Sequence, residues 1–318
     1  MNVSILSVRS GWHTDELLRA LSERGHVGVV VPYEGLVARI GGGLRSEGVP
    51  LFESDAVLAR IIPSGSLEQI IFRVDALHWI EERGVPVINS PRAIERAVDK
   101  FYTSALLQEA GLPTVETVVC ERAADAMAAV RAFGDAVIKP IFGSMGHGIV
   151  RVSDPDVAFR VVKTLETTRA VFYVQRAIDH GGRDYRLFVV GGRVLAAIER
   201  RAADGDWRTN VARGASARAV TVSAEWERLA LAAAAAVGAD YAGVDLLPGR
   251  DAAVFVLEVN AIPGWQGLQR ATGLDVAAAI VEHLEHRVAS HDSAHTHRVD
   301  GDHLVGRGAR KRPAGSPV

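Results

Sequence analysis

Residues 254–265 read VFVLEVNAIPGW, and the fold assignment rests first on this stretch. Glu258 and Asn260 stand two positions apart on an apolar strand, so both side chains point to the same face. Asp245 ends a neighbouring apolar strand in YAGVDLLPG (241–249) and adds a second carboxylate. An all-oxygen set suits Mg²⁺, which takes one or two protein carboxylates and completes its octahedron with water and phosphate oxygens. We therefore expect a phosphate donor beside this metal site.

A glycine-rich segment upstream is the candidate phosphate site. Lys139 directly follows the apolar strand 136–138, and the sequence GSMGHG comes next at 143–148. Glycines let backbone N–H groups approach phosphate oxygens, and the lysine ammonium adds a positive charge. The spacing is not that of a Walker loop, and the segment leads into a strand at 149–152, which predicts a hairpin flap. Without Lys139 and the metal strand, an ordinary glycine turn would be the simpler interpretation.

Arginines cluster between this flap and Asp245. The cluster comprises Arg183, Arg186, Arg200, Arg201, Arg208 and Arg213. Strand alternation places Asp184 and Arg186 on one face. Arg208, Thr209 and Asn210 offer guanidinium, hydroxyl and amide donors in consecutive positions, all of which phosphate oxygens accept. We expect Arg208, Asn210 and Arg213 to contact a phosphate ligand, whereas Arg201 fits a solvated surface position.

Apolar periodicity predicts an α/β and α+β protein of three lobes. An open parallel sheet at the front is indicated by helices at 14–24 and 67–83 that alternate with strands at 2–8, 27–31, 56–62 and 86–88. A largely antiparallel third lobe is indicated by strands at 171–175, 184–190, 193–200, 241–247 and 253–259. The expected division is 1–98, a central lobe with the flap at 99–170, a metal-binding lobe at 171–287, and a disordered His/Arg-rich tail at 288–318.

Composition excludes several classes of partner. Thirty-six basic residues nearly balance thirty-eight acidic ones, so we expect no general affinity for nucleic acid or for membranes. The longest uncharged apolar run, 229–239, is too short to cross a bilayer. Ser4, Ser7 and Arg9 interrupt the N-terminal apolar run, which argues against a signal peptide. Cys120 is the single cysteine, and the cytoplasm is the expected location.

An ordered series of motifs resembles the ATP-grasp superfamily and its RimK-type amino-acid ligases. The series is Lys100, Lys139, GSMGHG, AIERRAADGDWRTNVARGA (197–215), AGVDLL (242–247) and LEVNAIPGW (257–265). It spans roughly residues 90–285, and the front lobe resembles the pre-ATP-grasp domain of such enzymes. The resemblance implies an ATP-grasp fold in which two α+β lobes clasp ATP.

The resemblance also implies roles for individual residues. The phosphates would bind Lys100, Lys139, Arg208, Asn210 and the flap residues Gly143, Ser144, Met145, Gly146 and Gly148. Magnesium, as two ions for which Mn²⁺ could substitute, would bind Asp245, Glu258 and Asn260. Arg213, with Arg186, would be catalytic and would face an acyl phosphate. We assign Asp184, Gln175, Arg176 and Ala177 to the nucleotide site as well, although Arg176 stands where the family has a carboxylate for the ribose.

The front half resembles a narrower group. The segment LARIIPSGSLEQIIFRVDALHWIEERGVPVINSPRAIERAVDK (58–100) is similar to RimK-type proteins associated with tetrahydromethanopterin and related one-carbon cofactors. This similarity implies an enzyme of cofactor biosynthesis that adds L-glutamate to an acceptor carboxylate and releases ADP and phosphate. It also implies a homo-oligomer. The alternatives are a glutamate ligase acting on a protein C-terminus and a non-catalytic ATP-binding regulatory protein.

Overall fold

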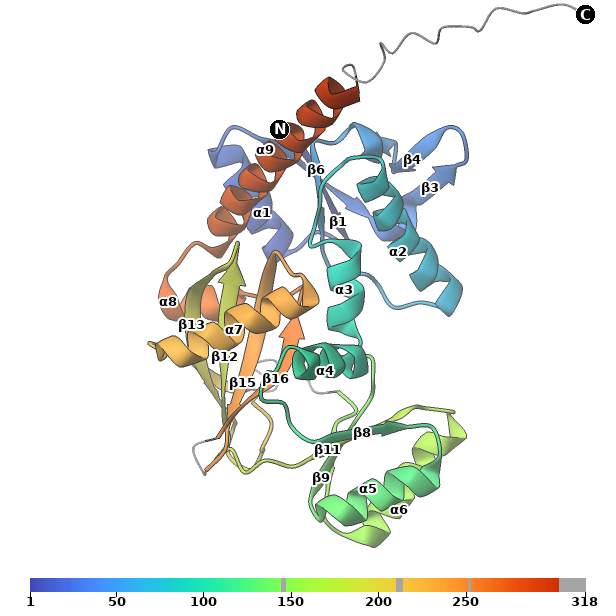
Figure 1. Cartoon of the computed structure of the whole chain (residues 1–318), viewed down its shortest axis with the longest axis vertical. Coiled ribbons are helices and arrows are strands. Elements are labelled where there is room, and N and C mark those ends of the chain that lie inside the picture. The colour runs from blue at the N-terminus through green and yellow to red at the C-terminus, as the bar shows by residue number, and fades with distance from the viewer. Residues whose placement is uncertain (144–146, 210–213, 251–252, 303–318) are drawn as a thin grey trace, which may run out of the picture.

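The N-terminal lobe is built on a parallel sheet, as the sequence predicts. The computed structural model describes residues 1–143, 147–209, 214–250 and 253–302. Strands run in the order β2-β1-β6-β7 and all neighbours are parallel. Their bounds are β1 Asn2–Ser7, β2 Val27–Pro32, β6 Ala56–Ala59 and β7 Val87–Ile88, with helices α1 Trp12–Glu23 and α2 Leu67–Glu82. This lobe lies at the top of Figure 1.

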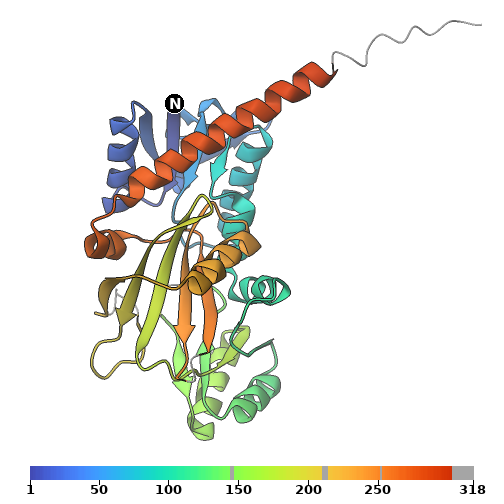
Figure 2. The same ribbon diagram turned by 60° about the vertical axis from the view of Figure 1, so that its left-hand side comes forward.

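Two features of this lobe differ from expectation. A small antiparallel sheet of β3 (Leu36–Arg39), β4 (Gly43–Ser46) and β5 (Val49–Pro50) follows β2. Helix α9 (Val276–Asp302) continues beyond residue 287, where the sequence predicted that order ends, because 288–300 contains no glycine or proline to stop a helix. Residues 303–318 of the expected tail lie outside the described residues. Figure 2 shows α9 running across the N-terminal lobe.

The central lobe is an antiparallel sheet covered by two helices. Its order is β10-β9-β11-β8, with helices α5 (Ala123–Phe133) and α6 (Pro155–Thr167) packed on one shared core. The bounds are β8 Thr117–Cys120, β9 Ala136–Lys139, β10 Val150–Val152 and β11 Phe172–Arg176. Antiparallel pairing of β9 with β10 makes the predicted hairpin of the flap. The boundary at 171 was wrong, because β11 pairs with β8 and β9 and not with the third sheet.

The C-terminal lobe carries the segment from which the fold was predicted. Five antiparallel strands run in the order β14-β13-β12-β15-β16. They are β12 Arg183–Val190, β13 Arg193–Arg201, β14 Ser216–Val220, β15 Tyr241–Pro248 and β16 Val254–Asn260, and α7 Ala224–Val237 covers one face. Helix α4 (Lys100–Glu109) shares this core through Leu107, although the sequence division placed it in the central lobe (Figure 1).

The N-terminal and C-terminal lobes share one apolar core. Val3, Ile5 and Leu17 of the N-terminal lobe cluster with Phe188 and Trp265 of the C-terminal lobe. The link between the lobes is α3 (Pro91–Val98), which begins with proline at its first position after the N-cap residue Ser90. Short α8 (Gln266–Thr272) follows the metal strand. None of the helices in the described part of the chain is long and apolar enough to cross a membrane.

Candidate active site

The three predicted metal ligands lie on neighbouring strands. Asp245 of β15 is directly opposite Glu258 of β16, and Gly243 is opposite Asn260. The Asn260 Oδ1 atom accepts a hydrogen bond of 2.9 Å from the Ile262 backbone N–H, which orients the amide. Within the described residues, the Glu258 carboxylate has neither a hydrogen bond nor an ion pair. The chemistry of this donor set, two carboxylates and an amide oxygen, fits Mg²⁺.

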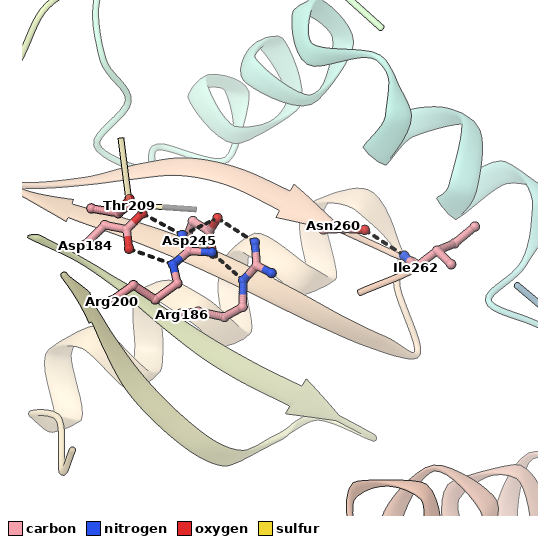
Figure 3. A network of polar contacts seen from close by, with 7 residues as sticks. All are labelled: Asp184, Arg186, Arg200, Thr209, Asp245, Asn260 and Ile262. Carbon is pink, nitrogen blue, oxygen red and sulfur yellow. Dashed lines mark hydrogen bonds and ion pairs between the residues drawn. The ribbon is translucent and has the colours of Figure 1, made fainter. Parts of the chain in front are cut away.

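Asp245 is held by two guanidinium groups (Figure 3). Arg186 donates from Nε to Oδ1 and from Nη2 to Oδ2, each at 2.7 Å, and Arg200 donates from Nη2 to Oδ2 at 2.8 Å. Burial opposes ionisation of Asp245, but Arg186 and Arg200 outweigh it and lower the pKa of the carboxyl. An ionised carboxylate oxygen accepts about two hydrogen bonds, so Oδ2 is filled and Oδ1 keeps one free direction. Oδ1 is therefore the atom available to a cation.

Arg200 also binds Asp184, so one buried guanidinium joins two carboxylates. Its Nε donates to Asp184 Oδ1 at 2.7 Å and its Nη2 to Oδ2 at 2.5 Å. Thr209 Oγ1 donates to the same Oδ2 at 2.6 Å (Figure 3). Asp184 was expected in the nucleotide site, but its carboxylate is buried and engaged inside the protein.

The two predicted phosphate-binding lysines lie near Glu258 of β16, whose charge acts on both of them. Lys139 Nζ donates to Gln175 Oε1 at 2.6 Å. Gln175 is itself buried, and its Nε2 donates to Thr117 Oγ1 and to the Tyr173 hydroxyl. Gln175 thus orients Lys139, a role that the sequence did not suggest. Lys100 Nζ donates to the backbone oxygens of Ile141 and Gly143, at 3.1 and 2.8 Å, where the flap begins.

The Glu258 carboxylate affects the pKa of both lysines. Burial lowers the pKa of Lys139 to about 8, with Glu258 opposing the shift and Lys100 adding to it. Burial also lowers the pKa of Lys100, again with Glu258 opposing. Two desolvated ammonium groups lie near only one unpaired carboxylate, so this part of the site has an excess of positive charge that an anion could balance. Phosphate oxygens would supply the balancing negative charge and would raise the pKa of both lysines.

This arrangement predicts that ATP affinity falls in alkaline solution. With a pKa of about 8, Lys139 is about nine-tenths protonated at pH 7 and about one-tenth at pH 9. Phosphate favours the ammonium, so the contribution of Lys139 is present below pH 8 and is lost as the pH rises through 8. The Kd for ATP, measured by calorimetry, should rise about tenfold between pH 7 and 9.

The matched control for this prediction is Lys139→Arg, because a guanidinium stays protonated over the whole range. Its ATP affinity should be nearly independent of pH between 7 and 9. An equally steep loss of affinity in Lys139→Arg would show that another group titrates.

The flap requires glycine at its C-terminal end, at Gly148. Gly148 has φ +73°, in the left-handed region, and a Cβ there would lie 3.4 Å from Pro140 Cγ. Gly143, at the first end, would place a Cβ 3.3 Å from the same atom. Several predicted ligands lie outside the described residues, namely Ser144, Met145, Gly146, Asn210 and Arg213.

Three residues that were expected to contact the nucleotide have partners within the protein. Arg176 donates to the Glu116 carboxylate at 2.7 and 3.0 Å. The backbone N–H of Arg176 donates to the backbone oxygen of Glu116, and that of Ala177 to the backbone oxygen of Asp135. An adenine contact through these N–H groups would have to replace these bonds. Arg208 donates to Asp206, and this bond holds the pKa of Asp206 at about 2. The Arg208 side chain remains partly exposed.

Comparison with known proteins decides the family. A family model described as the RimK-like ATP-grasp domain matches residues 97–284. The chain belongs to the RimK-like ATP-grasp family. It is an ATP-dependent ligase that forms carbon–nitrogen bonds, which confirms the predicted fold and enzyme class. The non-catalytic alternative is therefore set aside.

RimK-like relatives match nearly the whole chain. The tetrahydromethanopterin:alpha-L-glutamate ligase of Methanosarcina acetivorans is 35% identical over 310 residues, covering 86% of this chain and 95% of the relative. A probable alpha-L-glutamate ligase of Sodalis glossinidius is 35% identical over 301 residues, covering 92% and 100%. Among solved structures, ATP-grasp ligase PsnB complexed with minimal precursor, Mg and ADP has a TM-score of 0.70 at 21% identity, covering 90% and 98%.

Proposed function

We propose that this RimK-like ligase transfers the γ-phosphoryl group of ATP to an acceptor carboxylate and then joins the acyl group to L-glutamate. The first step forms an acyl phosphate and ADP. In the second, the glutamate amine attacks the acyl carbon, phosphate leaves, and the amine gives up a proton as the amide forms. No protein nucleophile is needed, so catalysis consists of positioning and charge stabilisation.

The observation that carries this proposal is the position of one carboxylate without a hydrogen-bond partner near two half-buried lysines. Glu258 lies opposite Asp245, and its charge opposes the lowering of the pKa that burial causes in both Lys100 and Lys139. Asp245, Glu258 and Asn260 would hold Mg²⁺, which neutralises charge on the triphosphate when bound. Two ions, or Mn²⁺ in their place, would fit the same oxygen donors. The Mg and ADP named for the neighbour PsnB support this choice.

The chain's own residues divide the remaining work. Lys139 and Lys100 would hold phosphate oxygens, and the flap from Gly143 to Gly148 would close over them and exclude water. Arg186 uses Nε and one N–H of Nη2 on Asp245, so its other N–H groups remain for a phosphate or acyl oxygen. Arg208 and Asn210 stay assigned to the triphosphate, and Arg213 to the acyl phosphate. Asp184 would act through Arg200 and not on the nucleotide.

For the acceptor we propose the carboxylate of a pterin-type or other one-carbon cofactor. Three relatives, at 35%, 32% and 37% identity, are named tetrahydromethanopterin:alpha-L-glutamate ligases, which supports both the acceptor and glutamate. We further propose the cytoplasm as location, a homo-oligomer as the active form, and three lobes with the central lobe extended to β11. A protein C-terminus is the competing acceptor.

The test is a screen of acceptors coupled to ADP release, followed by the mass of the product. With ATP, Mg²⁺, L-glutamate and a reduced pterin acceptor, we expect ADP release and an acceptor heavier by one or more glutamyl residues. Peptides that end in glutamate form the parallel arm. Glutamylation of the peptides alone would overturn the pterin proposal, and ADP release without any amide product would overturn ligation.

A further inference from the structure

Asn89 is a fully buried side chain of the N-terminal lobe at the carboxyl end of β7. Its Oδ1 accepts from the backbone N–H groups of Asp240, at 2.6 Å, and Tyr241, at 3.1 Å. Its Nδ2 donates to the backbone oxygen of Tyr241, at 2.8 Å, and to that of Ala261. An asparagine amide has two donor hydrogens and about two acceptor sites. All four of these positions are therefore used, and we call the four hydrogen bonds the Asn89 clamp.

These bonds join the ends of two strands that carry the metal ligands. Tyr241 is the first residue of β15, which carries Asp245 four residues later. Ala261 directly follows Asn260, the last residue of β16, which also carries Glu258. One side chain from another lobe thus fixes the spacing of β15 and β16 at the end where Asn260 lies. The sequence shows only an asparagine before a helix cap.

Two further residues of the same lobe contact the segment after β16. Neither of them forms hydrogen bonds with the backbones of both Tyr241 and Ala261, as Asn89 does. His13 Nε2 accepts from the Trp265 N–H at 3.1 Å, and burial together with Arg60 lowers the pKa of His13 to about 4. Arg60 donates to the Tyr241 hydroxyl at 3.0 Å and to the Pro263 oxygen at 3.2 Å. The first turn of α1 and the residues that directly follow β6 and β7 therefore all contact this part of the C-terminal lobe.

We propose that Asn89 is a positioning residue for the metal site, acting through the backbones of β15 and β16. The inference rests on the proposed function, because it requires Asp245, Glu258 and Asn260 to bind Mg²⁺. Magnesium demands near-ideal octahedral geometry, so a small change in the spacing of two strands weakens its binding. The shared apolar core of Ile5, Leu17, Phe188 and Trp265 keeps the lobes together when the clamp is lost.

The experiment compares Asn89→Ala with Leu17→Ala, a truncation in the same core that leaves the clamp intact. Mn²⁺ binding in the presence of ADP is followed by electron paramagnetic resonance, together with thermal unfolding. We expect Mn²⁺ affinity to fall about 10- to 100-fold in Asn89→Ala, as for residues that orient metal ligands. Leu17→Ala should unfold at a lower temperature and bind Mn²⁺ as the wild type does.

Two outcomes separate this inference from the function on which it rests. If Asn89→Ala lowers the unfolding temperature but binds Mn²⁺ as tightly as Leu17→Ala does, Asn89 is only structural and the inference is overturned. If the wild-type protein binds no Mn²⁺ with ADP, the proposed metal site itself fails.

Hydrogen exchange of the wild-type protein covers the case in which Asn89→Ala does not fold. Coupling between two sites is reciprocal, so metal binding must also tighten the clamp. The Asp240 and Tyr241 amides, which donate to Asn89, should exchange more slowly with ADP and Mg²⁺ than with ADP alone. Equal exchange rates under the two conditions would overturn the inference.

Discussion

Glu258→Gln should slow ligation severely and leave ATP binding largely intact. Turnover should fall by about a thousandfold, which corresponds to roughly 4 kcal/mol of transition-state stabilisation. Glu258 is the ligand with the largest expected effect because its carboxylate has no hydrogen bond or ion pair within the described residues, whereas Asp245 is held by Arg186 and Arg200. Turnover is measured as acceptor-dependent ADP release, and ATP binding by calorimetry.

The matched control for Glu258→Gln is Glu282→Gln, the same chemical change at an exposed residue that pairs with Arg193 at 3.4 Å. Its turnover should equal that of the wild type. Wild-type turnover in Glu258→Gln would remove the metal site from the account.

The second large effect concerns stability. Arg200→Met should lower the free energy of unfolding by about 3–5 kcal/mol, because it leaves the Asp184 and Asp245 carboxylates buried without this partner. The side chains of Arg200, Asp184 and Asp245 are each 5% exposed or less, so water cannot replace the guanidinium. Urea unfolding followed by circular dichroism measures the loss.

Arg201→Met is the neighbouring control for Arg200→Met. Its side chain is 59% exposed and pairs with Glu199 at 3.2 Å. Glu199 is buried, but without Arg201 it keeps the hydrogen bond from the Tyr185 hydroxyl at 2.9 Å and the ion pair with Arg218 at 3.3 Å. The lost contact comes from an exposed guanidinium and contributes at most about 1 kcal/mol, so this variant should unfold nearly as the wild type does. Equal losses for Arg200→Met and Arg201→Met would mean that the buried network does not stabilise the lobe.

The shared face of Glu258 and Asn260 could be predicted from the sequence because the rule involved is local. Side chains two apart on a strand share a face, and this places Glu258 with Asn260 whatever the strand pairs with. Lys139 at the end of an apolar strand and the flap that follows were recognisable for the same reason. The pairing of Asp245 with Glu258 joins two separate strands and does not follow from a local rule. The resemblance to RimK-type ligases nevertheless implied that the two residues lie together, because it assigned both to magnesium.

What the sequence missed depends on contacts between distant segments. Arg200 received no role because nothing in ERR at 199–201 reveals that β12 and β13 place it between Asp184 and Asp245. Gln175 was assigned to the nucleotide, yet the pairing of β11 with β8 and β9 turns it toward Lys139 and Thr117. Asn89 resembles any residue that precedes a helix cap until the C-terminal lobe is packed against it.

The central claim is that a carboxylate is activated by phosphoryl transfer, and isotope transfer tests it most directly. The acceptor found in the screen is prepared with oxygen-18 in its carboxylate and incubated with ATP, Mg²⁺ and L-glutamate. The account predicts one labelled oxygen in inorganic phosphate for each amide formed, with unlabelled ADP as the other product. Label in AMP, or amide formation with no label in phosphate, would contradict it.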